Sequence, residues 1–193
     1  MVRADRGETT HTYIVPLAVT IRRCTEQDLP DLEWYGLFTP HREIIRAAYD
    51  AQCRGDGLML VAEVNGFPAG QVWIDLARYR AQRIGVLWAV RVYPFLCSLG
   101  IGRELVVAAE QWLHAHGYVG AELGVEPDNP DARRLYERLG YVVCRRARAA
   151  FSYTPPRGDA PITVEFDELI MRKRLRRYRQ PPAQRPQARR AAS

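Results

Sequence analysis

The chain of 193 residues is 47% hydrophobic, which is enough for one globular domain with a packed core. Its four cysteines are scattered without a Cys-x-x-Cys pair, which argues against a disulfide framework or a thiolate metal site. His114 and His116 lie two residues apart on an expected helix and do not share a face, so no metal site is expected.

The two ends of the chain differ from its middle. Residues 1–18 are expected to form a loose lead-in, and the apolar patch Ile14–Val19 is too short for a signal sequence or a membrane span. The net charge of +6 is concentrated near the end, because residues 172–193 hold nine basic residues and no acidic one. Residues 176–193 predict a disordered basic tail, which favours a solvated segment over a nucleic-acid or membrane arm. The domain is therefore expected at 19–175, in the cytoplasm.

Hydrophobic periodicity and turn residues predict one α/β domain with a mixed sheet. Asn65-Gly66, between two alternating runs, is a strong signal for a tight hairpin turn. In chain order, the expected elements are a strand at Val19–Arg23, helices at Pro30–Leu37 and His41–Arg54, strands at Leu58–Val64, Ala69–Asp75 and Arg83–Val92, a helix at Gly100–His116, a strand at Val119–Val125, a helix from Asn129, and strands at Tyr141–Tyr153 and Ile162–Arg172.

Residues 129–141 predict a short helix with well-defined ends. Asn129 suits the N-cap, Pro130 the first helical position, and Gly140 the left-handed residue after the last turn. Apolar residues at i, i+3, i+4 and i+7 form one face. That face includes Tyr136, a phenol near the middle of the helix.

Residues 90–103 predict a strand that ends near Pro94, then a loop through Gly100 and Gly102, and then a helix. The first N–H groups of a helix have no internal partner, and glycine lets the backbone approach a phosphate closely, so this segment is a candidate anion site. Alone, a Gly-x-Gly that opens a helix is more often a packing or turn device. Neither a Walker loop nor the Gly-x-Gly-x-x-Gly spacing is present.

Taken together, the two segments resemble the GNAT superfamily of N-acetyltransferases. The family hallmark runs Val-x-Pro, Gln/Arg-x-x-Gly-x-Gly/Ala, a second strand, and Asn-x-x-Ala-x-x-Leu-Tyr-Glu-Lys-x-Gly-Phe. This chain matches it, in order, with Val92–Pro94, Cys97–Gly102, Val119–Val125 and Asn129–Tyr141. The resemblance spans Val19 to about Leu175. It implies a GNAT fold: a mostly antiparallel sheet of six to seven strands, flanked by about four helices, with splayed central strands.

The resemblance also implies an acetyl-CoA site. The backbone of Val90 and Val92 would pair with the pantetheine arm, and Asn129 would contact the CoA arm besides capping its helix. Cys97 stands where the family usually has Gln or Arg; because the loop binds mostly through its backbone, this change should weaken a side-chain contact without abolishing the site. The residues implied to offer N–H groups to the pyrophosphate are Ser98, Leu99, Gly100, Ile101, Gly102 and Arg103.

Tyr136 matches the tyrosine that protonates the departing CoA thiolate in the family. Amine acetylation ends with a thiolate that needs a proton, and a positioned general acid contributes typically about 10²–10⁴-fold to the rate. The alternative interpretation of Tyr136 is an amphipathic tyrosine that covers the core.

The general base is harder to assign. The bases of two familiar branches are missing, since the middle of the central strand reads Val86-Leu87-Trp88 and the position five residues before the motif asparagine is Gly124. Strand alternation puts Glu122 and Glu126 on the same face as Gly124, so either could act directly or through water. Asp75 is a third candidate, and an ordinary surface carboxylate is the alternative for each.

The sequence favours a small-molecule primary amine as acceptor, such as an amino sugar, polyamine, amino acid or antibiotic. A protein or peptide amine is the nearest rival, and a non-catalytic acyl-CoA-binding module is the alternative from a different class. Homodimers are common in the superfamily, but no residue here argues for one. The aromatic residues available to line an acceptor pocket are Trp34, Tyr35, Phe38, Tyr49, Trp73 and Trp88.

Overall fold

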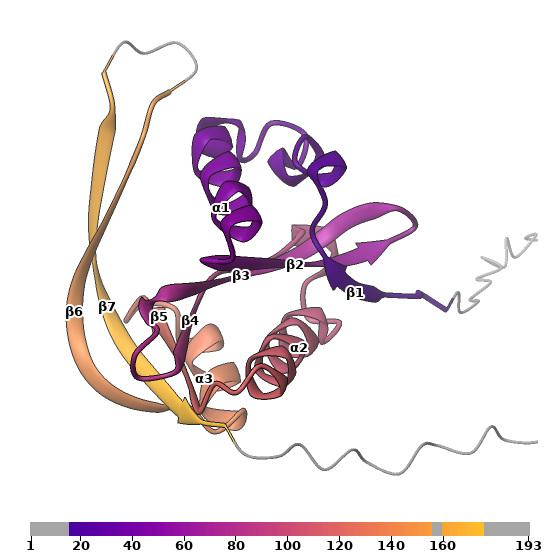
Figure 1. The fold of residues 1–193 in the computed structure, drawn as a ribbon. Helices are drawn as coiled ribbons and strands as arrows, with labels where there is room; N and C mark the ends of the chain where they lie inside the picture. Colours follow the sequence, from indigo (N-terminus) through magenta and orange to yellow (C-terminus); the bar gives the residue numbers. More distant parts are fainter. Residues whose placement is uncertain (1–15, 156–159, 176–193) are drawn as a thin grey trace, which may run out of the picture.

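The computed structural model describes residues 16–155 and 160–175, which form one mixed sheet with helices on both faces (Figure 1). Within these residues the sheet has seven strands in the order β1-β2-β3-β4-β5-β7-β6. All neighbouring strands are antiparallel except β4 and β5, which run parallel. The strands are β1 Thr20–Arg23, β2 Gly57–Val64, β3 Phe67–Tyr79, β4 Ile84–Val92, β5 Gly120–Val125, β6 Val142–Tyr153 and β7 Ile162–Arg174.

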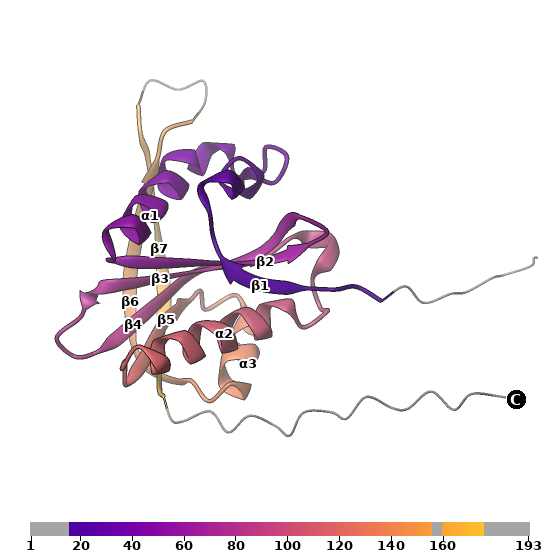
Figure 2. The ribbon, with the colours of Figure 1, turned by 45° about the vertical axis from the view of Figure 1, so that its right-hand side comes forward.

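Helix α1 covers one face of the sheet, and α2 and α3 cover the other (Figure 2). Side chains of β2 alternate between the two faces of the sheet and contribute to a hydrophobic core on each face. Met59 and Val61 pack with side chains of α1, whereas Leu58 and Leu60 belong to the cluster that contains residues of α2. Within the described residues, no helix is long and apolar enough to cross a membrane. The helices are α1 Arg42–Arg54, α2 Ile101–Ala115 and α3 Pro130–Arg138, with 3-10 turns η1 Glu26–Asp28, η2 Asp31–Glu33, η3 Thr39–His41 and η4 Pro94–Leu96.

The expected fold class is confirmed, but the helix predicted over Pro30–Leu37 is wrong. This segment holds only the 3-10 turn η2, and Trp34 and Tyr35 beyond it have left-handed φ values of 45° and 56°. Trp34 is buried, and its indole N–H donates a hydrogen bond of 2.8 Å to the backbone oxygen of Pro68. This tertiary contact with the first residues of β3 overrides the local helical pattern. Within residues 16–155 and 160–175, three α-helices therefore flank the sheet instead of about four.

Strands β4 and β5 pair over only part of their length. The ladder ends at the pair Leu87–Leu123, although β4 continues to Val92. Ala89, just beyond the last pair, has a φ of 49°, and the pairing of β4 with β3 is irregular at the same level. The far end of β4 stays attached to β3, so its edge toward β5 has no strand partner among the described residues. The expected splay of the central strands is therefore present.

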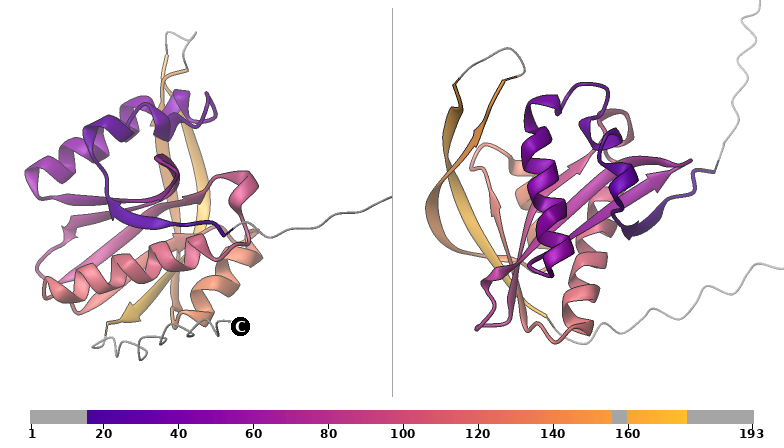
Figure 3. Two further views of the ribbon diagram at one scale, coloured as in Figure 1. Left: turned by 90° about the vertical axis from the view of Figure 1, so that its right-hand side faces the viewer. Right: turned by 45° about the horizontal axis from the view of Figure 1, so that its top comes forward.

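Strands β6 and β7 form a long two-stranded ribbon that lies at a steep angle to the other strands (Figures 2 and 3). Only Leu169–Arg174 of β7 pair with β5, and the first part of β7 pairs with β6 alone. The ribbon reaches the start of α1, where the ring centroid of His41 lies 5.6 Å from that of Phe151 and 5.2 Å from that of Tyr153. The ribbon therefore forms a wall beside the space between α1 and the sheet.

Candidate active site

The loop before α2 has the geometry of an anion site. Ser98 and Gly100 have positive φ values of 64° and 85°, and Gly100 is the N-cap of α2. The first intrahelical hydrogen bond runs from the N–H of Glu104 to the oxygen of Gly100, at 3.1 Å, so the N–H groups of residues 101–103 have no helical acceptor. A Cβ built on Gly102 would meet no atom closer than 3.6 Å, which leaves the backbone accessible. These features fit a bound pyrophosphate.

Cys97 does not obstruct this loop. Its thiol donates toward the backbone oxygens of Val92 and Tyr93, at 3.6 and 3.7 Å, and so is directed back toward the end of β4. The side chain of Arg103 pairs with Glu104 on the surface. The anion site at Ser98–Arg103 stays a prediction, and the groups that this loop offers to an anion are backbone N–H groups.

A slot of about 180 Å³ lies between the splayed ends of β4 and β5. Val90 of β4 and Ala132 and Tyr136 of α3 line it. Asn129 also lines the slot, and its side-chain oxygen accepts a hydrogen bond of 3.1 Å from the N–H of Ala132, which confirms its N-cap role. Two of the residues expected at the cofactor, Val90 and Asn129, thus lie together with Tyr136, the expected acid. Val92 lies outside the lining, beside the start of α2.

Tyr136 is held in a buried position that preserves its proton. Its side chain is 6% exposed, and its ring packs edge to face on that of Tyr141 with centroids 6.0 Å apart. Burial raises the pKa of Tyr136 to about 12, because the anionic phenolate is poorly solvated there. The phenol is therefore protonated at neutral pH, as a tyrosine with its ordinary pKa also is.

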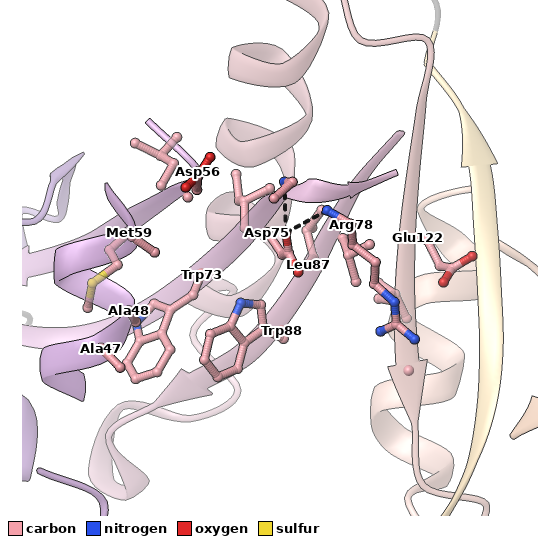
Figure 4. A pocket seen from close by; sticks show the side chains of 18 of the residues that line it. Ala47, Ala48, Asp56, Met59, Trp73, Asp75, Arg78, Leu87, Trp88 and Glu122 are labelled. Carbon is pink, nitrogen blue, oxygen red and sulfur yellow. Dashed lines mark hydrogen bonds between the residues drawn. The ribbon is translucent and has the colours of Figure 1, made fainter. Parts of the chain in front are cut away.

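A second, larger cavity of about 670 Å³ lies on the α1 face of the sheet (Figure 4). Its floor is apolar: Trp73 and Trp88 pack edge to face with centroids 4.7 Å apart, and Met59 and Ala48 lie beside them. An apolar floor with a few charged groups suits a small organic ligand. The charged residues that line the cavity are Arg54, Asp56, Asp75, Arg78, Glu122 and Glu168.

The slot and the larger cavity adjoin each other at the end of the β4–β5 ladder. Five residues line both spaces: Leu87, Trp88, Leu123, Gly124 and Glu168. The slot, lined by residues of α3, and the larger cavity, lined by residues of α1, therefore share these five residues as a common boundary at the gap in the sheet.

The carboxylates expected as bases lie in different surroundings. Glu122 is 1% exposed; one of its oxygens pairs with Nε of Arg172, and the other lies 3.6 Å from the guanidinium of Arg145. Glu126 is exposed and lines only the slot. Asp75 accepts hydrogen bonds of 2.8 and 3.0 Å from the backbone N–H groups of Ala77 and Arg78. Glu122 therefore lies beside the larger cavity and Glu126 beside the slot. The expectation that strand alternation puts both on one face is wrong, because β5 ends at Val125, before Glu126.

Glu168 of β7 is a site residue that sequence reasoning does not single out. It is half-buried and lines both spaces. Desolvation is the main cause that raises the pKa of Glu168 above its ordinary value, with the charge of Glu122 acting in the same direction and Arg78 and Arg145 opposing it. Its position depends on how β7 pairs with β5, where Gly124 lies opposite Ile170. No local pattern in the sequence reports that register.

The family model for the acetyltransferase (GNAT) family matches residues 24–141, which is more than half of the chain. The chain therefore belongs to the GNAT family of acetyltransferases. Mycothiol acetyltransferase of Nocardiopsis dassonvillei is 32% identical over 111 residues, which cover 55% of this chain and 33% of that protein. An uncharacterised N-acetyltransferase of Bacillus subtilis, YhfO, is 31% identical over 117 residues, which cover 54% of this chain and 78% of the relative. The chain spans between about a quarter and a third of the length of the mycothiol acetyltransferases that it matches.

Solved structures share the fold at low sequence identity. The protein yncA of Salmonella typhimurium, solved with its cofactor acetyl-CoA, has a TM-score of 0.64 at 20% identity and covers 86% of this chain and 99% of its own. The ribosomal-protein-S18-alanine N-acetyltransferase of Escherichia coli also has a TM-score of 0.64 at 20% identity, over 84% of this chain and 97% of its own. These likenesses support the fold assignment.

Proposed function

We propose that the protein is an acetyl-CoA-dependent N-acetyltransferase that acetylates a primary amine of a small molecule by direct attack within a ternary complex. The observation that carries this proposal is the junction of two cavities in the gap of the sheet, with Tyr136 on the slot side. A transferase that joins two ligands needs such a junction, because the reacting atoms must approach to about 3–3.5 Å.

The cofactor would lie along the slot and end at the start of α2. Acetyl-CoA supplies a thioester carbonyl that an amine can attack and a thiol that can leave. The backbone of Val90 and Val92 would pair with the pantetheine, and Asn129 would contact the arm. The N–H groups of residues 98–103 would bind the pyrophosphate. A Cβ built on Gly102 would lie 3.6 Å from the side chain of Val92 and 4.0 Å from that of Leu135. The start of α2 is therefore adjacent to both β4 and α3.

Tyr136 would protonate the sulfur as the carbon–sulfur bond breaks. Its side chain lines the slot beside Val90 and Ala132, which is where the thioester would lie if the pantetheine follows β4. The raised pKa of Tyr136 keeps the phenol protonated until that step.

The larger cavity would hold the acceptor. Its volume of about 670 Å³ falls within the usual range of ligand pockets, roughly 300–1,000 Å³. Two tryptophans on the floor suit an apolar body, and the carboxylates around it suit an ammonium group. The relatives named mycothiol acetyltransferase make mycothiol-related amines one group of acceptors to test.

Thermal unfolding with and without millimolar acetyl-CoA, CoA or ATP tests the cofactor site. A ligand at 100 times its Kd stabilises the folded state by about 2.7 kcal/mol, so acetyl-CoA and CoA should each raise the melting temperature by at least about 5 °C, and ATP should not. Absence of a shift with both acetyl-CoA and CoA would overturn the proposed function.

Release of CoA thiol then identifies the acceptor. The amines to compare are 2-phenylethylamine, spermidine, glucosamine, lysine and a short peptide with a free N-terminus. Faster thiol release with one of the small amines supports the proposal, whereas release with the peptide alone points to a protein acceptor. Acetyl-CoA binding without thiol release from any amine would favour a non-catalytic acyl-CoA-binding module.

A further inference from the structure

Three glutamates lie near the gap in the sheet, but only one of them reaches both ligand spaces. Glu122 lines the acceptor cavity and not the slot, whereas Glu126 lines the slot and not the cavity. Glu168 lines both, and it is the only ionisable residue among the five that do. A group that takes a proton from the amine as the amine approaches the thioester has to lie at this junction.

Glu168 occupies the space that a side chain at position 124 would fill. A Cβ built on Gly124 would overlap Oε2 of Glu168 and would lie 2.7 Å from its Cδ. The carboxyl group of Glu168, on β7, therefore lies over β5 at Gly124, where β5 has no side chain. Glycine at position 124 is what leaves room for this carboxylate in the gap.

The charges around Glu168 leave its carboxylate available. Glu122 on β5 is held by Arg172 and Arg145, whereas no hydrogen bond or ion pair joins the carboxylate of Glu168 to another of the described residues. The charged groups that face it are Arg78 on β3, Arg145 on β6 and Glu122 on β5. Desolvation raises the pKa of Glu168, which brings it closer to neutral pH and makes it a better proton acceptor than an exposed glutamate.

We propose that Glu168 is the general base of the acetyl transfer, a role that rests on the function proposed above. Its carboxylate takes one proton from the acceptor ammonium and passes it to solvent. The lone pair of the amine nitrogen then forms the bond to the thioester carbon. The carbon–sulfur bond breaks with its electron pair going to sulfur, and Tyr136 protonates that sulfur. The nitrogen loses its second proton to the deprotonated carboxylate, which passes it to solvent as well, and the phenolate of Tyr136 regains a proton from solvent. Two protons therefore leave and one returns, so one proton is released in total.

Replacing Glu168 by glutamine tests this role, because glutamine keeps the shape and removes the basicity. The assay is CoA thiol release with acetyl-CoA and the fastest amine of the panel above. Glu168→Gln should lower kcat/KM on the order of 100-fold, while the acetyl-CoA-induced shift in melting temperature stays as in the wild type. The matched control is Asp167→Asn, an exposed carboxylate on the same strand, which should stay within twofold.

The pH profile separates a chemical role from a structural one. In the wild type, kcat/KM should fall as the pH is lowered through the raised pKa of Glu168, because the protonated carboxyl cannot accept a proton. Glu168→Gln should lack this acid limb; since the same amine is used for both proteins, its own titration is common to both profiles. An unchanged limb in Glu168→Gln would overturn the proposal.

Moving the carboxylate to the neighbouring strand gives a second test. In the double variant Gly124→Glu, Glu168→Ala, the alanine clears the space that the new side chain needs, so activity should recover at least tenfold over Glu168→Ala alone. A Glu168→Gln variant that keeps the wild-type kcat/KM would overturn the base role, whatever the double variant shows. If acetyl-CoA binds to the wild type but no amine releases thiol, the base role and catalysis are both overturned and the cofactor site stands; if acetyl-CoA does not bind, the proposed function itself fails.

Discussion

Tyr136 carries the most direct expectation for a single residue. Replacing it by phenylalanine keeps the edge-to-face packing on Tyr141 and removes only the hydroxyl. We expect Tyr136→Phe to lower turnover at least tenfold, since a general acid contributes about 10²–10⁴-fold. The stabilisation by acetyl-CoA should be unchanged. Steady-state thiol release measures the first effect and thermal unfolding the second. Tyr141→Phe, which removes a neighbouring hydroxyl, is the control, and equal turnover in both variants would refute the acid role.

Asp28 stabilises the turn that leads from β1 toward α1. It is 6% exposed; its two oxygens each lie 2.7 Å from the guanidinium of Arg22, and one also accepts a hydrogen bond of 2.7 Å from the N–H of Thr25. These contacts, led by the hydrogen bond from Arg22, lower the pKa of Asp28 from 3.8 to about 2. Because the pKa is lower in the folded state, the stabilisation is complete above about pH 4 and is lost as the pH falls toward 2.

We therefore expect Asp28→Asn to lower the free energy of unfolding by about 2 kcal/mol at pH 7. The difference from the wild type should shrink between pH 4 and pH 2, where the wild type loses the same contribution. Urea denaturation at several pH values measures both effects. Asp31→Asn, nearby and exposed, should change the free energy of unfolding by less than about 0.5 kcal/mol. A difference that does not depend on pH would contradict the ion-pair explanation.

Among the secondary-structure elements, the start of α2 depends on backbone shape more than on side chains. Gly100 has a φ of 85° and open space around it, so Gly100→Ala introduces backbone strain of about 1–2 kcal/mol without a steric clash. If the strain is relieved by moving the loop, the N–H groups of residues 101–103 shift from the pyrophosphate, and we expect the Kd for acetyl-CoA to rise about tenfold.

A matched control exists at the end of α1. Gly55 has a φ of 80° and similarly open space, and it is the C-cap of a helix on the opposite face. Gly55→Ala should lower the melting temperature comparably and leave the Kd for acetyl-CoA unchanged, as isothermal titration calorimetry can show. An equal loss of affinity in both variants would mean that general destabilisation, and not the shape of this loop, weakens binding.

Elements whose signals are local could be predicted from the sequence. Asn65 and Gly66 have φ values of 49° and 80°, as a two-residue hairpin turn requires, and Asn129 caps α3 through its side chain. The segment Pro30–Leu37 could not be predicted in the same way, because the group that holds Trp34 is Pro68, 34 residues further along the chain. Helix propensity describes only the local preference of this segment, whereas the contact between Trp34 and Pro68 determines its structure.

At the scale of the whole molecule, the same distinction explains which parts of the candidate site were predictable. The loop at Ser98–Arg103 and Tyr136 lie in contiguous motifs, so the resemblance to the family hallmark points to them from the sequence. Glu168 reaches the gap only because six residues of β7 pair with β5 in one particular register and because Gly124 leaves the space open. A slip of one residue would turn Glu168 to the other face of the sheet, and no pattern within β7 encodes that alignment.

The gap between β4 and β5 also affects how two ligands share one protein. The slot is lined by side chains of α3, and the larger cavity is lined by side chains of α1, so under the proposed function each ligand would approach from its own side of the sheet. Neither would have to depart before the other arrives, and the products could leave in either order. A single compound that links an amine-like head to a CoA-like arm through the gap would fill both spaces at once, and its length would be set by the thickness of one β-sheet.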